Sequence, residues 1–311
     1  MFPERFNAIR GLDPGVLCSL LARSSRMKSD PGSFSTILKG KTVLQFFVEN
    51  STRTRLSFES ATRRLGGMSL AFSPSSSSLS KGETLADTVN VIRQYGVDGI
   101  VVRHRSMGAP DFLADATGLP VINAGDGAHE HPTQALLDAF TLGECWGVDF
   151  SKAGAFRNRK IMILGDLRHS RVARSNIHLL TALGAELHLC APATLGIPDL
   201  GLFPRVHVHS FPDEGIPEMD AVMTLRLQTE RQNQGVIPSL PEYREFWGLT
   251  VERAKRMKTD SVILHPGPVN RGVEIDSEVA DSGRSLILKQ VENGIFARMA
   301  VLASVVGRMD S

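Results

Sequence analysis

Short apolar segments recur along the chain, and most are separated by stretches with helical periodicity. This alternation is typical of parallel β-sheets, because two parallel strands need a crossover connection, usually a helix, between them. Asp13 and Pro14 predict that a helix precedes the first strand, as an N-cap and a first helical residue. The predicted strands are 42–48, 99–102, 120–122, 160–164, 186–190, 221–224 and 262–264. The predicted fold class is therefore α/β with doubly wound parallel sheets.

The predicted strands fall into two sets, one on each side of an amphipathic segment at 132–146. The segment 147–159 is rich in Gly, Lys, Arg and Asn and is the predicted joint between two domains. A final helix near 291–306 is expected to pack back on the first domain. We therefore expect one domain from 1–146 plus 290–311, a second from 147–289, and an active site in the cleft between them.

Composition restricts the class of protein. The chain has 311 residues, 42% of them hydrophobic, and can bury a large core. Its net charge is only +2, whereas proteins that bind nucleic acids or membrane surfaces usually carry a large excess of one charge. Neither a nucleic acid nor a membrane is therefore expected as a partner. No apolar run reaches the roughly 18 residues that cross a bilayer, and the start lacks a secretion signal, so a cytoplasmic location is expected. Cys18, Cys145 and Cys190 lie in apolar segments and are expected to be reduced core thiols without a catalytic role.

The sequence STRTR at 51–55 lies between a predicted strand and a predicted helix. A helix start offers unpaired backbone N–H groups and the positive end of the helix dipole. Hydroxyl and guanidinium groups at that point predict a seat for a multiply charged oxyanion such as a phosphate. The alternative from these residues alone is an N-capped surface helix with spare charges.

Three further polar groups lie where predicted strands end or helices begin. Arg103 and His104 follow the strand 99–102, the sequence HPTQ at 131–134 opens a helix, and HPGP at 265–268 follows the strand 262–264. The polar segments 73–83 and 228–240 are predicted loops.

Two other enzyme classes are not supported by the sequence. A nucleotide-dependent dehydrogenase needs G-x-G-x-x-G after a strand, and neither this motif nor a P-loop is present. A metal hydrolase is suggested by the pairs His129/His131 and His207/His209, but neither has H-E-x-x-H spacing or a third ligand nearby in sequence. Alternating histidines indicate the polar face of a strand.

Six motifs occur in order between residues 42 and 275: FVENSTRTRLSFE, SLSKGETLADT, HEHPTQALLDAFT, GDLRHSRVARS, MTLRLQTER and HPGPVNRGVEI. Together they resemble the catalytic chains of the aspartate carbamoyltransferase family. The resemblance implies transfer of the carbamoyl group of carbamoyl phosphate to the α-amino group of L-aspartate. The products would be N-carbamoyl-L-aspartate and phosphate, in de novo pyrimidine biosynthesis, and no metal or cofactor is implied.

The resemblance also implies roles for individual residues. Those implied to bind carbamoyl phosphate are Ser51, Thr52, Arg53, Thr54, Arg103, His131 and Gln134. Those implied to bind aspartate are Lys81, Arg171, Arg226, Gln228, Gly267 and Pro268. The implied catalytic residues are Arg53, Thr54, Lys81, Arg103 and His131. Closure of the cleft is implied to pair Glu49 with Arg171 and Arg231.

A homotrimer with shared active sites is a further implication of the resemblance. In this family a serine and a lysine of one subunit reach the site of its neighbour, here Lys81 with either Ser77 or Ser78. The sequence leaves open a regulatory or dihydroorotase-like subunit, inhibition by nucleotides, cooperativity and any assembly beyond the trimer.

Two alternatives remain beside this interpretation. Ornithine carbamoyltransferases share the phosphate site, but Lys81 and Arg226 would repel the side-chain cation of ornithine. The ornithine enzymes also have a Cys after the His in the segment that reads HPGP at 265–268 in this chain. A non-catalytic anion-binding subunit of a pyrimidine-synthesis assembly would be expected to lack a charged site residue, and none is missing.

Overall fold

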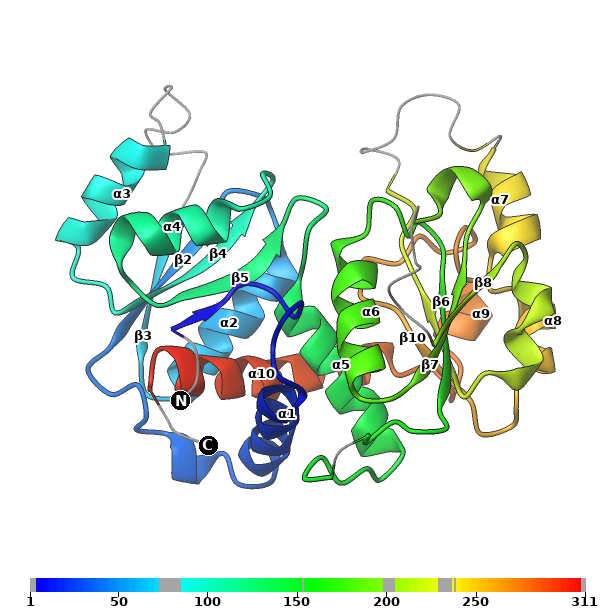
Figure 1. The fold of residues 1–311 in the computed structure, drawn as a ribbon, viewed down its shortest axis with the longest axis horizontal. Helices are drawn as coiled ribbons and strands as arrows, with labels where there is room; N and C mark the ends of the chain where they lie inside the picture. Colours follow the sequence, from blue (N-terminus) through cyan, green and yellow to red (C-terminus); the bar gives the residue numbers. More distant parts are fainter. Residues whose placement is uncertain are drawn as a thin grey trace.

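Two parallel sheets form the framework of the chain (Figure 1). The computed structural model describes residues 4–72, 85–152, 154–197, 205–228, 237 and 239–308. The first sheet has the strand order β1-β5-β4-β2-β3, with β1 (Arg5–Phe6), β2 (Thr42–Phe47), β3 (Met68–Phe72), β4 (Gly99–His104) and β5 (Val121–Asp126). The second has the order β10-β9-β6-β7-β8, with β6 (Lys160–Leu164), β7 (Glu186–Cys190), β8 (Val206–His209), β9 (Ala221–Thr224) and β10 (Val262–Leu264).

The central strands of each sheet are buried on both faces. Neighbouring residues of β2, Val43 and Leu44, belong to different hydrophobic clusters, and so do Ile161 and Met162 of β6. Successive side chains of a strand point to opposite faces, so the central part of each sheet is covered on both sides. All strand pairs described are parallel. The predicted doubly wound α/β fold is confirmed.

Four of the described helices, α1, α6, α7 and α8, begin at a residue whose side chain caps the helix. Asp13 Oδ1 accepts a hydrogen bond from the N–H of Gly15 at 2.7 Å, and the Ser170 side chain accepts one from Ala173 at 3.1 Å. Both bonds satisfy N–H groups that a helix start leaves unpaired. The helices are α1 (Pro14–Ser29), α2 (Thr52–Arg64), α3 (Leu85–Gln94), α4 (Ala109–Thr117), α5 (Pro132–Cys145), α6 (Arg171–Ala182), α7 (Leu240–Trp247), α8 (Val251–Arg256), α9 (Ser277–Ala280) and α10 (Ile287–Val305).

Helix α5 is buried on every side. The sequence predicted an amphipathic segment here, and that prediction is wrong, because every residue from Pro132 to Gly143 is buried. The helix packs against α1, α6, α10 and β5, which leaves it no solvent face before Glu144. Helix α10 also packs on α1 and α2, beside which Figure 1 shows it. The two helices therefore lie at the centre of a core that reaches both sheets.

The sequence missed two strands at the edges of the first sheet. Strand β1 has two residues, and four of the five residues of β3 are exposed, so neither shows the periodicity of a buried strand. Arg103 and His104 lie within β4, which runs beyond its predicted end, so the prediction that they follow the strand is wrong. His207 and His209 lie on β8, at the edge of the second sheet.

The three cysteines are free of disulfides but differ in exposure. Cys190 is buried and Cys18 is partly buried, whereas Cys145 is exposed in the last turn of α5. The prediction of core thiols is therefore wrong for Cys145, which lies past the buried part of its helix. Across the described ranges, no helix has both the length and the apolar character that a bilayer span requires.

Candidate active site

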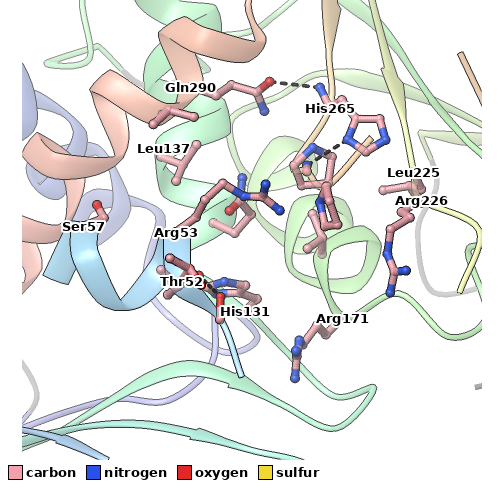
Figure 2. Close-up of a pocket in the computed structure, with 18 of the residues that line it drawn as sticks. Thr52, Arg53, Ser57, His131, Leu137, Arg171, Leu225, Arg226, His265 and Gln290 are labelled. Carbon is pink, nitrogen blue, oxygen red and sulfur yellow. Dashed lines mark hydrogen bonds between the residues drawn. The ribbon is translucent and has the colours of Figure 1, made fainter. Parts of the chain in front are cut away.

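A cavity of about 860 Å³ lies where the carboxyl ends of strands from both sheets meet (Figure 2). Open parallel sheets bind ligands at this edge, because the loops and helix starts that follow the strands converge there. The cavity is lined by all predicted site residues that fall within the described ranges. These are Glu49, Ser51, Thr52, Arg53, Thr54, Arg103, His131, Gln134, Arg171, Arg226, Gln228, Gly267 and Pro268.

The start of α2 forms one wall of the cavity. Ser51 is the N-cap residue, but its side chain makes no capping bond and instead its Oγ donates to Thr54 Oγ1 at 2.9 Å. The Ser51 side chain therefore does not cover the first N–H groups of the helix, which carry the positive end of its dipole. Together with Thr52 and Arg53 they give this wall the donors that an oxyanion requires.

Arg53 reaches from α2 to the loop that follows β10. A Cβ built on Gly267 would lie 3.0 Å from Arg53 Cζ, so the guanidinium lies directly against that glycine. Gly267 has φ +69°, a conformation that favours glycine, and both properties explain why no larger residue fits there. Burial, and then the charge of Arg226, lower the pKa of Arg53. The pocket is thus electropositive, and a bound anion would relieve the repulsion between the two arginines.

Glu49 connects the two sheets across the cavity. Its Oε1 accepts a hydrogen bond from Arg103 Nη2 at 2.8 Å. Its Oε2 accepts one from Arg171 Nη1 at 3.1 Å, and its Oε1 accepts another from Arg171 Nη2. Arg103 lies in β4 of the first sheet, whereas Arg171 begins α6 beside the second. Gly125 lies against both guanidiniums, because a Cβ there would be 2.9 Å from Arg171 Nε and 3.1 Å from Arg103 Nη1. Glu49 therefore offsets the repulsion between two closely placed cations.

His131 is a buried, neutral imidazole at the start of α5. Its side chain is almost completely enclosed, and burial holds its pKa well below the ordinary value, with Arg103 and Arg171 lowering it further. Its backbone N–H donates to Ser175 Oγ at 2.9 Å, which fixes the residue against α6. Nδ1 is buried and makes no hydrogen bond to any residue that the structure describes. The ring is thus held in place with hydrogen-bonding capacity left for a ligand.

The amide of Gln134 is oriented by a buried carboxylate. Asp138 Oδ1 accepts from Gln134 Nε2 at 2.8 Å and from Gln290 Nε2 at 2.7 Å, and Oδ2 accepts from Asn176 Nδ2 at 2.8 Å. Burial raises the pKa of Asp138 to about 6 despite these three donors. Because Nε2 of Gln134 is engaged, its Oε1 is the atom left to accept a hydrogen bond from a ligand in the cavity.

Arg226 and Gln228 follow β9 and line the side of the cavity nearer the second sheet. Gln228 Nε2 donates to the carbonyl of His169 at 3.2 Å. Figure 2 shows the side chains of Arg53, Arg171 and Arg226 entering the pocket from separate elements. Four predicted residues, Lys81, Arg231, Ser77 and Ser78, lie outside the described residues.

Sequence reasoning missed several residues that shape the site. Arg298 of α10 lines the cavity and donates to Ser57 Oγ at 2.8 Å, and burial lowers its pKa to about 10. Gln290 Oε1 accepts from the backbone N–H of His265 at 2.9 Å, as Figure 2 shows. His265 Nδ1 in turn accepts from the N–H of Gly267 at 2.8 Å. The signal that could have pointed to these residues is the presence of Gln290 and Arg298 inside the otherwise largely apolar stretch 287–305.

Comparison with known proteins agrees with this geometry. One family model, described as the aspartate/ornithine carbamoyltransferase carbamoyl-P binding domain, matches residues 5–144. A second, described as the Asp/Orn binding domain of the same family, matches residues 157–305. The chain belongs to the aspartate/ornithine carbamoyltransferase family.

Relatives within the family are similar over nearly the whole chain. The aspartate carbamoyltransferase catalytic subunit of Maricaulis maris is 51% identical over 306 residues, 97% of this chain and 93% of the relative. That of Myxococcus xanthus is 48% identical over 294 residues, 94% of this chain and 96% of the relative. Such identity over almost all of both chains makes this chain a carbamoyltransferase with the two-domain organisation of its family.

Solved structures agree at the level of the fold. Aspartate transcarbamoylase from Trypanosoma cruzi, in complex with carbamoyl phosphate and aspartate, superimposes with a TM-score of 0.85 at 29% identity, over 97% of this chain and 96% of that one. Ornithine carbamoyltransferase from Thermus thermophilus has the same TM-score at 24% identity, over 98% and 100% of the two chains. The fold is therefore common to both branches, and the second substrate depends on the side chains.

Proposed function

We propose that this carbamoyltransferase transfers the carbamoyl group of carbamoyl phosphate to the α-amino group of L-aspartate, giving N-carbamoyl-L-aspartate and phosphate. One observation carries the proposal. Arg53, Arg103, Arg171 and Arg226 come from four separate elements and line one cavity together with a neutral His131. A phosphate and two carboxylates need a cluster of cations of this kind. Relatives 45–51% identical to this chain are named aspartate carbamoyltransferase catalytic subunits.

Carbamoyl phosphate fits the wall formed by the start of α2. Its phosphate would take hydrogen bonds from Ser51, Thr52, Arg53 and Thr54, and Arg103 would reach both the phosphate and the carbonyl oxygen. Charge grows on the phosphate as its bond to carbon breaks, so donors fixed at that point stabilise the transition state.

His131 and Gln134 are proposed to hold the carbamoyl group itself. An N–H of the neutral imidazole would donate to the carbonyl oxygen, on which negative charge develops during attack. Gln134 Oε1 would accept from the carbamoyl NH2, because the Gln134 Nε2 already donates to Asp138. The amine nitrogen then bonds to the carbonyl carbon, the C–O bond to phosphate breaks, and the nitrogen transfers one proton to the departing phosphate.

Aspartate is the proposed second substrate. Arg171, Arg226 and Gln228 would bind its two carboxylates, with Lys81 contributed by a neighbouring subunit and the backbone near Gly267 and Pro268 lying beside the carbamoyl group. Ornithine brings a side-chain cation in place of the second carboxylate. The repulsion between Arg53 and Arg226, which contributes to the lowered pKa of Arg53, argues against a further cation in this cavity.

The test is to supply carbamoyl phosphate with either L-aspartate or L-ornithine and to measure both phosphate and the carbamoylated amino acid. We expect turnover with aspartate, and an Arg226→Ala variant with a strongly raised KM for aspartate. Arg271→Ala is the matched control, because Arg271 pairs with Asp281 on the surface and does not line the cavity. Turnover with ornithine alone would establish the other branch, and no turnover with either would support a non-catalytic anion-binding subunit.

We propose that residues 1–146 with 290–311 form the carbamoyl-phosphate domain and 147–289 the aspartate domain. The packing of α10 on α1 and α2 supports its assignment to the first. The contact of Glu49 with Arg171 supports closure of the two domains around both substrates, to which Arg231 would contribute. Closure would expel water and orient the amine toward the carbonyl carbon.

We also propose a cytoplasmic homotrimer in which Lys81 acts in the neighbouring site. Strand β3 supports an interface, because it is a sheet edge with Met68 and Leu70 exposed, and free sheet edges are usually covered. Mixing Lys81→Ala chains with His131→Asn chains should restore activity, since shared sites regain both side chains in some combinations. Unrestored activity in mixed oligomers of trimer mass would refute the shared site.

A further inference from the structure

Strands β7 and β8 bring three histidines together at the edge of the second sheet. The paired positions of the two strands are His188 with His207 and Cys190 with His209. The rings stack, with centroids 5.0 Å apart from His188 to His207 and from His188 to His209. None of these residues lines the active-site cavity. The proposed carbamoyl transfer gives this cluster no role.

We propose that Glu186, His188 and His207 bind a divalent transition metal ion, with Zn²⁺ preferred. Glu186 Oε1 lies 3.1 Å from His188 Nε2 and 3.6 Å from His207 Nε2, and the three ligand atoms lie within 4.8 Å of one another. Ligands about 2.0–2.1 Å from a tetrahedral ion are themselves roughly 3.3 Å apart. The two distances from the Glu186 oxygen therefore fit coordination of one ion with either histidine, and the third pair lies within 4.8 Å.

The identity of the donors selects the class of metal. Two imidazoles and one carboxylate suit zinc and its neighbours, whereas magnesium and calcium take oxygen ligands. Three protein ligands leave a fourth position for water. Glu186 and His207 also line a separate cavity of about 440 Å³, together with Arg157 and Arg205. His207 is half exposed, so an ion can reach its ring from solvent.

His209 and Glu214 orient the central ligand. His188 Nδ1 is hydrogen-bonded to His209 Nε2 at 2.8 Å, and His209 Nδ1 lies 3.4 Å from Glu214 Oε2. Histidines that bind metals commonly use their second ring nitrogen in this way, which fixes the ring and directs the other nitrogen at the ion. In His188 that other nitrogen is Nε2, the one facing Glu186.

One lysine competes for the same carboxylate, but weakly. Lys160 Nζ is 3.9 Å from Glu186 Oε1, and its close contact is with Glu218. Glu186 therefore remains available to a metal ion. Binding would join β8, the edge strand, to β7 by bonds additional to the sheet hydrogen bonds.

The experiment uses the full chain, freed of metal with a chelator and titrated with Zn²⁺ by calorimetry. We expect one tight site per chain in the unaltered protein and its loss in His207→Gln and Glu186→Gln. His207 is half exposed, so its replacement leaves folding intact. His209→Gln should weaken binding by about 10- to 100-fold. His178→Gln, which removes a histidine of α6, is the matched control and should bind as the unaltered protein does.

Two further measurements separate this site from nonspecific binding. Co²⁺ should give the visible absorption of a four-coordinate ion in the unaltered protein and not in His207→Gln. Zn²⁺ should raise the Tm of the unaltered protein and leave that of His207→Gln unchanged, while carbamoyl transfer without metal is equal in the two. The proposal is overturned if His207→Gln binds Zn²⁺ with the same affinity and stoichiometry as the unaltered protein.

Discussion

Asp138 should make the stability of this protein depend on pH in a direction opposite to that of most carboxylates. Burial raises its pKa in the folded chain to about 6, from an ordinary value of 3.8. Between these values the folded state holds a proton that the unfolded state has lost, so the free energy of unfolding falls as pH rises. The full loss is about 3 kcal/mol, since each pKa unit corresponds to about 1.36 kcal/mol.

An Asp138→Asn variant removes this titration and keeps the side-chain shape. The Asn oxygen can take the place of Oδ1 and accept from Gln134 and Gln290, while its NH2 group faces Asn176. Asn176 Oδ1 is buried without a hydrogen bond to the described residues, so a flip of its amide restores the match. The flip gives up the bond from Asn176 Nδ2 to Val172 O, at about 1 kcal/mol.

The measurement is urea unfolding of both proteins from about pH 5 to about pH 7.5. We expect the unaltered protein to lose about 1.4 kcal/mol of stability relative to Asp138→Asn over this range, and the difference to level off above about pH 7. Asp149→Asn is the control, because hydrogen bonds from Ser151 lower the pKa of Asp149 and it titrates below this range. A difference between the Asp138 proteins that stays constant with pH would refute the argument from burial.

Three other substitutions test the site itself. Glu49→Gln should lower kcat roughly tenfold or more, because the side chain that bridges Arg103 and Arg171 loses its charge. The affinity for carbamoyl phosphate, measured by calorimetry, should change little. Equal losses in kcat and in affinity would contradict this role. Gly267→Ala should weaken carbamoyl phosphate binding about tenfold, since the new methyl displaces Arg53 and the positive φ is strained; unchanged binding would count against that contact. His131→Asn should lower kcat about 10²- to 10³-fold with KM nearly unchanged, as for an oxyanion donor, and a variant that keeps its turnover would remove His131 from the mechanism.

Local structure could be predicted from the sequence where residues close together in the chain determine it. The strands 160–164 and 186–190 match their predicted bounds. In 160–164 the reason is a run of apolar residues, which suits a strand buried on both faces. The polar helix start at 51–55, which lines the cavity, was likewise indicated by a strand, a helix start and their side chains. The edge strand β3 was missed because its exposed residues carry no such pattern.

The sequence by itself determined the α/β class, and it indicated the polar helix start at 51–55 and the types of side chain that line the cavity. Only the tertiary structure decided other meetings of distant residues: Glu49 with Arg103, Asp138 with Gln290, and Glu186 with His207. It also decided that α5 is buried all round, although its sequence indicated one polar face. The physical reason is that periodicity reports the surroundings of a single helix or strand, whereas these contacts depend on strand order and on how the helices pack between two sheets.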